Sequence, residues 1–117
     1  MLRVIVYGVT NDWGGVEAIV MGMIQRLSRE SKFDVIPSPV PSSYEKKFKG
    51  ENVSFIHIPS WGGDRKGFAE SLKNIYKNNH YDYLWINGCL MSNKTIVKVT
   101  KEYSDAKIIA HSHGSSF

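Results

Sequence analysis

Two histidines close the last apolar run of the chain. His111 and His113 flank Ser112, directly after residues 107–110. Residues two apart in an extended chain point to the same side, so both imidazoles could face one cleft. We favour a hydrogen-bonding or acid–base role for at least one of them. A metal pair is less favoured because no Cys, Asp or Glu stands beside them, and a bond to local backbone is the structural alternative.

A glycine-bearing turn follows the first apolar run, at residues 8–15, and leads into a helical pattern. Gly14 and Gly15 would let a ligand approach the backbone, and amides at a helix start suit a phosphate group. The glycine spacing is not that of a dinucleotide fingerprint, and the Lys-Ser/Thr pair of a P-loop is absent. A turn required only for close helix packing is an equally good interpretation.

Asn87 and Gly88 follow the fourth apolar run. The amide of Asn87 could bind a hydroxyl-rich substrate, or it could cap the turn that follows. Trp13 and Trp61 lie in predicted loops, where an indole ring can stack on the face of a sugar. Trp85 lies inside an apolar run and is expected in the core. Two further histidines, at positions 57 and 80, have no such context and are expected to be structural or solvated.

The elements that must position these residues alternate along the chain. Short apolar runs are typical of buried parallel strands, and between them apolar residues recur at helical spacing. Prolines at 37, 39 and 41 predict a loop at residues 37–41. The expected strands are 4–7, 33–36, 53–58, 83–86 and 107–110, and the expected helices are 16–27, 64–76 and 92–103, with Ser92 capping the last.

This alternation predicts an α/β fold, a Rossmann-like parallel sheet of about five strands with helices on both faces. Ligands of such sheets bind outside the carboxyl ends of the strands, where the strand order reverses. The first and fourth strands would flank that point. The glycine turn, the Asn87-Gly88 turn and the two histidines therefore converge on one edge.

Composition indicates one small globular domain of 117 residues with a formal charge of +4. No apolar run approaches the roughly 18 residues of a membrane span, and Cys89 is the single cysteine. Cys89 has no base partner nearby and is not expected to be a nucleophile. A cytoplasmic location is expected, without an internal disulfide.

The tightest basic cluster surrounds Phe48, with Lys46, Lys47 and Lys49. A solvated surface is the simplest interpretation of this cluster. Contact with anionic lipid headgroups is the second, which would place the protein at the inner face of a membrane. Nucleic acid is the least favoured partner, because a denser basic stripe with interleaved aromatics is expected for it.

Residues 4–8, followed by Trp13-Gly14-Gly15-Val16-Glu17, resemble the opening of family-4 retaining glycosyltransferases of the GT-B fold. In that family a strand leads to a Gly-Gly-Val-Glu turn. Residues 108–115 are similar to its fifth-strand segment. The resemblance implies that residues 1–117 are the N-terminal, acceptor-side domain of a two-domain enzyme, and that the C-terminal, donor-binding domain is absent from this chain.

The resemblance also implies roles for individual residues. Gly14 and Gly15 match the turn whose amides approach the donor diphosphate, and His113 matches the histidine that lines the catalytic cleft. His111 has no assured counterpart. The co-substrate would be a nucleotide-diphosphate sugar, the acceptor a glycan or a lipid-linked glycan in polysaccharide or cell-envelope synthesis, and neither cofactor nor metal is implied. The 117-residue chain alone is expected to be inactive.

Two other function classes remain open. A flavodoxin-like or receiver-like domain would need a hydroxyl-rich phosphate loop or an acidic cluster after the first strand, where only Thr10 and Asp12 stand. A non-catalytic sugar-binding module could use the same fold. A second Rossmann-like pattern of about 200 residues beyond Phe117 would favour the transferase.

Overall fold

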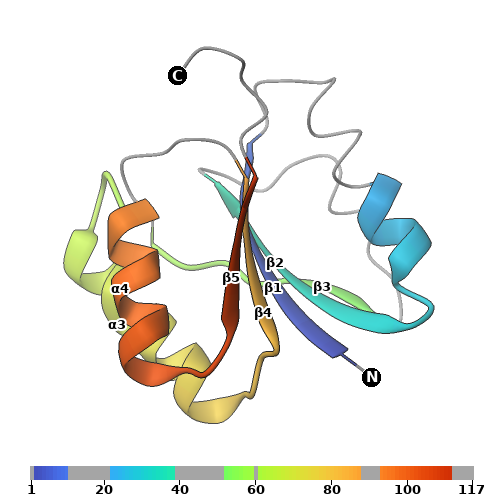
Figure 1. The fold of residues 1–117 in the computed structure, drawn as a ribbon. Coiled ribbons are helices and arrows are strands. Elements are labelled where there is room, and N and C mark those ends of the chain that lie inside the picture. The colour runs from blue at the N-terminus through green and yellow to red at the C-terminus, as the bar shows by residue number, and fades with distance from the viewer. Residues whose placement is uncertain (1, 11–21, 39–51, 60, 88–92, 112–117) are drawn as a thin grey trace.

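A computed structural model describes residues 2–10, 22–38, 52–59, 61–87 and 93–111. They form a five-stranded, all-parallel sheet with the strand order β3-β2-β1-β4-β5 (Figure 1). The strands are β1 (Leu2–Thr10), β2 (Ser31–Ser38), β3 (Val53–Phe55), β4 (Tyr83–Asn87) and β5 (Lys107–His111). The helices are α3 (Arg65–Asn78), α4 (Asn93–Tyr103) and a helical stretch at residues 22–27.

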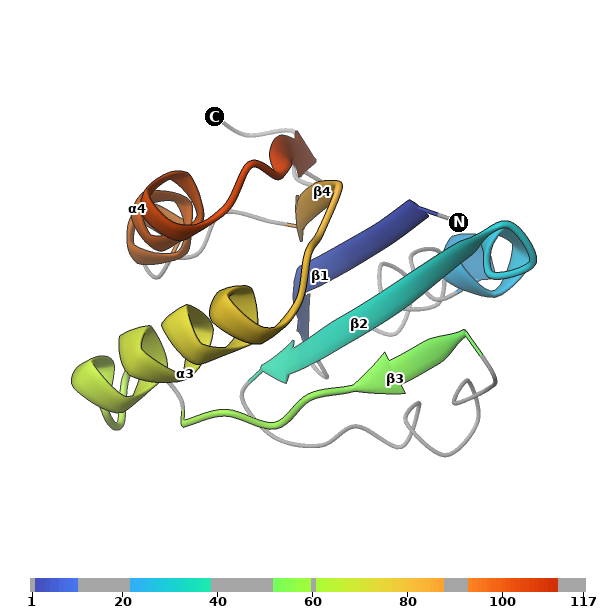
Figure 2. The same cartoon turned by 90° about the horizontal axis from the view of Figure 1, so that it is seen from below.

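Helices cover both faces of this sheet. Figures 1 and 2 show α3 and α4 on one face and the helical stretch 22–27 on the other. Side chains of β1 alternate between the faces, with Ile5 and Tyr7 toward α3 and α4 and with Val4 and Val6 toward the other side. The predicted fold class, a Rossmann-like parallel sheet with helices on both faces, is confirmed.

Two hydrophobic clusters form the core, one on each face of the sheet. The cluster under α3 and α4 contains Ile5, Tyr7, Ile36, Phe68, Leu72, Tyr76, Tyr81, Leu84, Ile86, Ile96 and Val99. The opposite cluster contains Val4, Val6, Ile24, Phe33, Val35, Val53 and Trp85. The expected core position of Trp85 is confirmed.

Helix α3 begins where the sequence provides a cap. The Asp64 side chain accepts a hydrogen bond from the backbone N–H of Gly67 at 2.9 Å, which satisfies one of the free amides of the first turn. Phe68, Leu72 and Tyr76 then recur at four-residue spacing and are all buried. This spacing is the predicted apolar stripe. It fixes α3 against the sheet.

Two predicted boundaries are wrong. Strand β2 continues through Pro37 to Ser38, two residues into the expected loop 37–41, whose other residues lie outside the described ranges. The expected strand 53–58 ends at Phe55. The N–H of Phe33 points toward β3 and donates to Asn52 O at 2.8 Å. Every second backbone nitrogen of β2 points the same way, so the nitrogen of Pro37 also faces β3. Proline has no N–H to give, so the ladder between β2 and β3 stops there.

The expected strand 4–7 extends over residues 2–10, and the other strands and helices lie close to their predicted ranges where the structure describes them. Residues 16–21 of the expected helix 16–27 lie outside the described residues. Helix α4 starts at Asn93, and its expected cap, Ser92, lies outside the described residues. None of the helices in the described ranges is long and apolar enough to cross a lipid bilayer.

Candidate functional site

The carboxyl edge of the sheet brings together two of the residues predicted from sequence. Asn87 ends β4 and His111 ends β5, and the two are partners in the parallel register. Neighbouring strands lie about 4.8 Å apart, so their backbones stand side by side. Strand β4 also pairs with β1, with Ile86 opposite Tyr7. Asn87 and His111 therefore lie where the strand order reverses, the point at which such sheets bind ligands.

Asn87 is buried at this edge and reaches across to β1. Only 1% of the residue is exposed, and its Nδ2 donates to the carbonyl oxygen of Tyr7 at 3.5 Å. Part of its hydrogen-bonding capacity thus joins β4 to β1, a role that was not among the sequence-based alternatives. A substrate contact through the same amide stays a prediction.

The other predicted site residues lie outside the residues that the structure describes: Trp13, Gly14, Gly15, Gly88, His113, and the basic cluster Lys46, Lys47, Phe48 and Lys49. For His111 the structure gives the place of its backbone in β5. The roles assigned to these residues remain predictions from sequence.

Trp61 joins the starts of α3 and α4 at the carboxyl side of the sheet. Its indole Nε1 donates to Thr95 Oγ1 at 3.1 Å, and the Arg65 guanidinium lies 4.0 Å from the ring centroid. Arg65 thus covers one face of the ring. Stacking of a sugar on that face would require Arg65 to move, so the arrangement favours a structural role for Trp61.

A buried polar cluster lies at the opposite, amino side of the sheet. Asp34 is 5% exposed, and its Oδ2 accepts hydrogen bonds from the Tyr81 hydroxyl at 2.6 Å and from Arg3 Nη2 at 3.3 Å. Arg3 Nη2 also donates to Asn79 Oδ1 at 3.2 Å. Burial, together with the hydrogen bond and charge of Asp34, raises the pKa of Tyr81, so this hydroxyl stays protonated as a donor.

This cluster has a structural role. It ties β1 and β2 to the end of α3 and to the segment before β4, and Asp34 lies level with Leu84, three residues before Asn87. Sequence reasoning missed it, although one signal was present. Asp34 stands alone inside an apolar run, and an ionised carboxylate is buried there only if donors meet it.

A second buried contact joins the two helices. The hydroxyl groups of Tyr76 and Thr100 lie 2.6 Å apart, and Thr100 Oγ1 also donates to Ile96 O at 2.7 Å. Burial raises the pKa of Tyr76 to about 12, against a smaller lowering by the hydrogen bond with Thr100.

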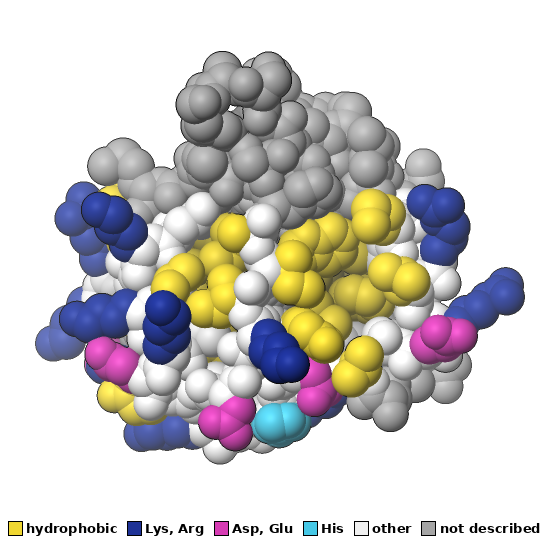
Figure 3. Space-filling model, viewed as in Figure 1, with side chains coloured by type: hydrophobic (Ala, Val, Ile, Leu, Met, Phe, Trp, Pro, Cys, Tyr) yellow, Lys and Arg dark blue, Asp and Glu magenta, His cyan; other side chains and the backbone are white. Residues whose placement is uncertain are grey.

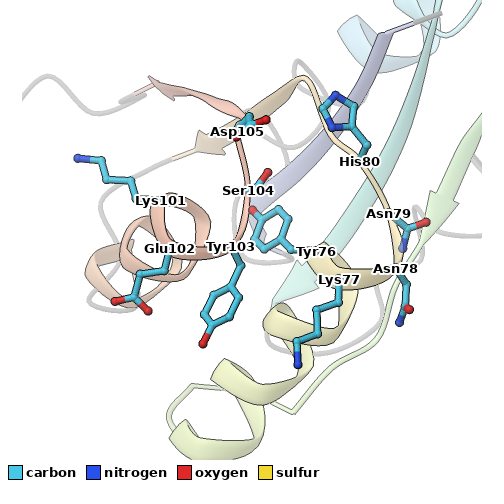
Figure 4. A pocket seen from close by; sticks show the side chains of 10 residues that line it. All are labelled: Tyr76, Lys77, Asn78, Asn79, His80, Lys101, Glu102, Tyr103, Ser104 and Asp105. Carbon is cyan, nitrogen blue, oxygen red and sulfur yellow. The ribbon is translucent and has the colours of Figure 1, made fainter.

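A pocket of about 670 Å³ opens between the C-terminal ends of α3 and α4 (Figure 4). Its walls include Lys77 and Lys101 but also Glu102 and Asp105, so cations and anions balance there. The pocket lies on the amino side of the sheet, away from the predicted site. No motif in the sequence pointed to it, because its walls come from two separate helix ends.

The two other histidines lie outside the predicted site. Both His57 and His80 are exposed, and His80 Nε2 stands 3.5 Å from Asp82 Oδ1, an ion pair only when the histidine is protonated. Across the described part of the chain, no three His, Cys, Asp or Glu side chains gather in a way that could hold a metal ion.

No protein-family model matches this sequence, and no curated protein matches it. Among solved structures, the chain is similar to the C-terminal domain of the PF1911 hydrogenase from Pyrococcus furiosus. One structure, of residues 78–226, has a TM-score of 0.62 at 14% identity and covers 93% of this chain and 89% of that one. A second, of residues 83–215, has a TM-score of 0.58 at 16% identity, with 94% and 91% covered. At such identity the likeness shows the α/β fold.

Proposed function

We propose that these 117 residues form the acceptor-side domain of a retaining glycosyltransferase that uses a nucleotide-diphosphate sugar. The observation that supports this most is the register of Asn87 with His111 at the carboxyl ends of β4 and β5, next to β1. The segments on which the family resemblance rests, 13–17 and 108–115, follow β1 and include the end of β5. Along the sequence, both segments thus come at or after the ends of strands whose carboxyl edge is where such folds bind ligands.

The chemistry of transfer suits these residue types. The departing diphosphate needs positive electrostatic potential, which backbone amides at a helix start supply, and Gly14 and Gly15 would allow close approach. The electron-poor sugar needs a hydrogen-bonding group held in position, the role we assign to His113. Trp13, Asn87, Gly88 and His111 would contact the acceptor or orient those groups.

The sharpest test compares two histidine variants in the protein encoded by the complete gene. We expect His113→Ala to lower kcat at least tenfold, about 1.4 kcal/mol in the barrier, with little change in KM or in melting temperature. His111→Ala serves as the matched control and should retain turnover. Loss of turnover at His111, with His113 affecting only melting, would reverse the assignment.

Two further outcomes decide between transfer and a non-catalytic sugar-binding module. Gly15→Val should weaken transfer because a branched side chain blocks the backbone, and the 117-residue chain alone should fold without transferring sugar. Binding of glycans without any turnover by the complete protein would favour the binding module. The Lys46–Lys49 segment is our proposed contact with an anionic membrane at its cytoplasmic face.

A further inference from the structure

The basic residues of this protein are unevenly distributed. Helices α3 and α4 together carry seven Lys and Arg side chains and only two Glu, a net charge of +5, whereas the whole chain carries +4. All other residues together therefore carry −1. We call these seven residues the basic face: Arg65, Lys66, Lys73, Lys77, Lys94, Lys98 and Lys101.

The lysines of α4 form one stripe. Lys94, Lys98 and Lys101 follow the i, i+4, i+7 spacing that places side chains on one side of a helix, and all three are exposed. The buried residues of the helix, Ile96 and Val99, lie on the opposite side. The stripe therefore points directly away from the sheet.

The lysines of α3 continue this surface on the flank that meets α4. Lys73 Nζ lies 5.5 Å from the centroid of the Tyr103 ring at the end of α4, and Lys77 lines the same pocket as Lys101 (Figure 4). The Glu70 carboxylate, 3.5 Å from Lys73 Nζ, raises the pKa of Lys73, so its ammonium group stays charged. Lys73 and Lys77 thus lie beside the C-terminal end of α4.

The two helices lie side by side on one face of the sheet (Figure 2), and dark-blue side chains gather over them in Figure 3. Six of the seven basic residues are exposed, and Lys73 is half-buried. Two adjacent helices present their outer side chains to one broad surface. A broad, planar, negatively charged partner can meet most of these charges at once.

We propose that the basic face is a docking surface for a membrane that carries anionic phospholipid headgroups. Six of its seven cations are lysines, compact charges on flexible stems that suit diffuse attraction better than the paired hydrogen bonds of arginine. Protein interfaces are anchored by several buried aromatic side chains. Among the described residues, Tyr103 is the one large exposed hydrophobic side chain on these helices.

Nucleic acid is the less suitable partner for the same composition. Binding sites for single strands combine a positive groove with aromatic side chains on which bases stack. On the described parts of α3 and α4, Tyr103 is the one exposed aromatic side chain available for stacking, and the pocket that it lines also contains Glu102 and Asp105. Membrane docking of the basic face is independent of sugar transfer and involves other residues than the Lys46–Lys49 segment.

The test is vesicle sedimentation of the 117-residue chain. Vesicles of phosphatidylcholine alone are compared with vesicles that also contain phosphatidylglycerol, at low and raised salt. We expect binding to the anionic vesicles only, and weaker binding at raised salt. Each lysine near such a membrane strengthens binding about fivefold, so Lys94→Gln, Lys98→Gln and Lys101→Gln combined should weaken it about a hundredfold.

Two triple variants remove the same charge elsewhere. Arg26→Gln with Arg29→Gln and Lys107→Gln acts on the other side of the sheet, where Lys107 pairs in register with Tyr83, and should weaken binding less than tenfold. Lys46→Gln with Lys47→Gln and Lys49→Gln isolates the other proposed membrane contact. Equal losses in the α4 variant and the Arg26 variant would overturn the inference. So would equal binding to neutral vesicles, tighter binding to a single-stranded oligonucleotide or to polyglutamate, or loss confined to the Lys46 variant.

Discussion

Replacing Tyr81 with phenylalanine removes the hydroxyl that donates to Asp34 Oδ2 at 2.6 Å and keeps the aromatic ring in the core. Asp34 is 5% exposed, so water cannot replace the lost donor, and the one other donor described for its carboxylate is Arg3 at 3.3 Å. A hydrogen bond to a charged group contributes about 1.5–3 kcal/mol. We expect Tyr81→Phe to lower the free energy of unfolding by about 2 kcal/mol.

Urea unfolding monitored by circular dichroism measures this change. Tyr83→Phe is the matched control, because the Tyr83 hydroxyl has no hydrogen-bond partner among the residues that the structure describes. It should change stability by less than about 0.5 kcal/mol.

A double-mutant cycle with Asp34→Asn then isolates the interaction of the two side chains. The coupling energy should be about 1–2 kcal/mol. A Tyr81→Phe protein as stable as the Tyr83→Phe control would refute the view that the Asp34 cluster holds the end of α3 and the segment before β4 against β1 and β2.

Three further predictions concern α3 and its contact with α4. Because the pKa of Tyr76 is raised to about 12, the folded state keeps a proton that the unfolded chain loses above pH 10, so stability should fall as the pH rises from 10 to 12, by roughly 3 kcal/mol from this residue. Tyr76→Phe should remove this share of the decline in unfolding experiments across this range, while the share of Tyr81, whose pKa is also raised, remains. Asp64→Ala should cost about 1 kcal/mol through loss of the cap. Gly67→Ala should fail to stabilise α3 unless Asp64 is also replaced, because the added Cβ would meet the Asp64 carboxylate, 2.8 Å from Cγ, and thermal melting of the single and double variants decides this.

The order of elements and the fold class were determined by the sequence, for a local reason. Apolar side chains are buried away from water, so an apolar run such as residues 83–86 predicts a buried strand. The four-residue spacing of Phe68, Leu72 and Tyr76 predicts a helix with one buried side. The convergence of the β4 and β5 ends was also predictable, since alternating strands and helices specify parallel strands whose carboxyl ends share one edge. The pairing of β1 with β4 is confirmed, and it follows from the strand order of Rossmann-like sheets.

Only the tertiary structure decided which residues far apart in the sequence form hydrogen bonds with one another. The end of β3 depends on Pro37 in the neighbouring strand, and the burial of Asp34 depends on Tyr81, 47 residues away. The Asn87 amide binds a carbonyl 80 residues earlier in the chain. No periodicity encodes such partners, because a hydrogen bond across the sheet depends on register and on the packing of both faces. The basic face is likewise a property of two helices placed side by side: each helix carries its lysines in sequence, but only the fold joins them into one surface.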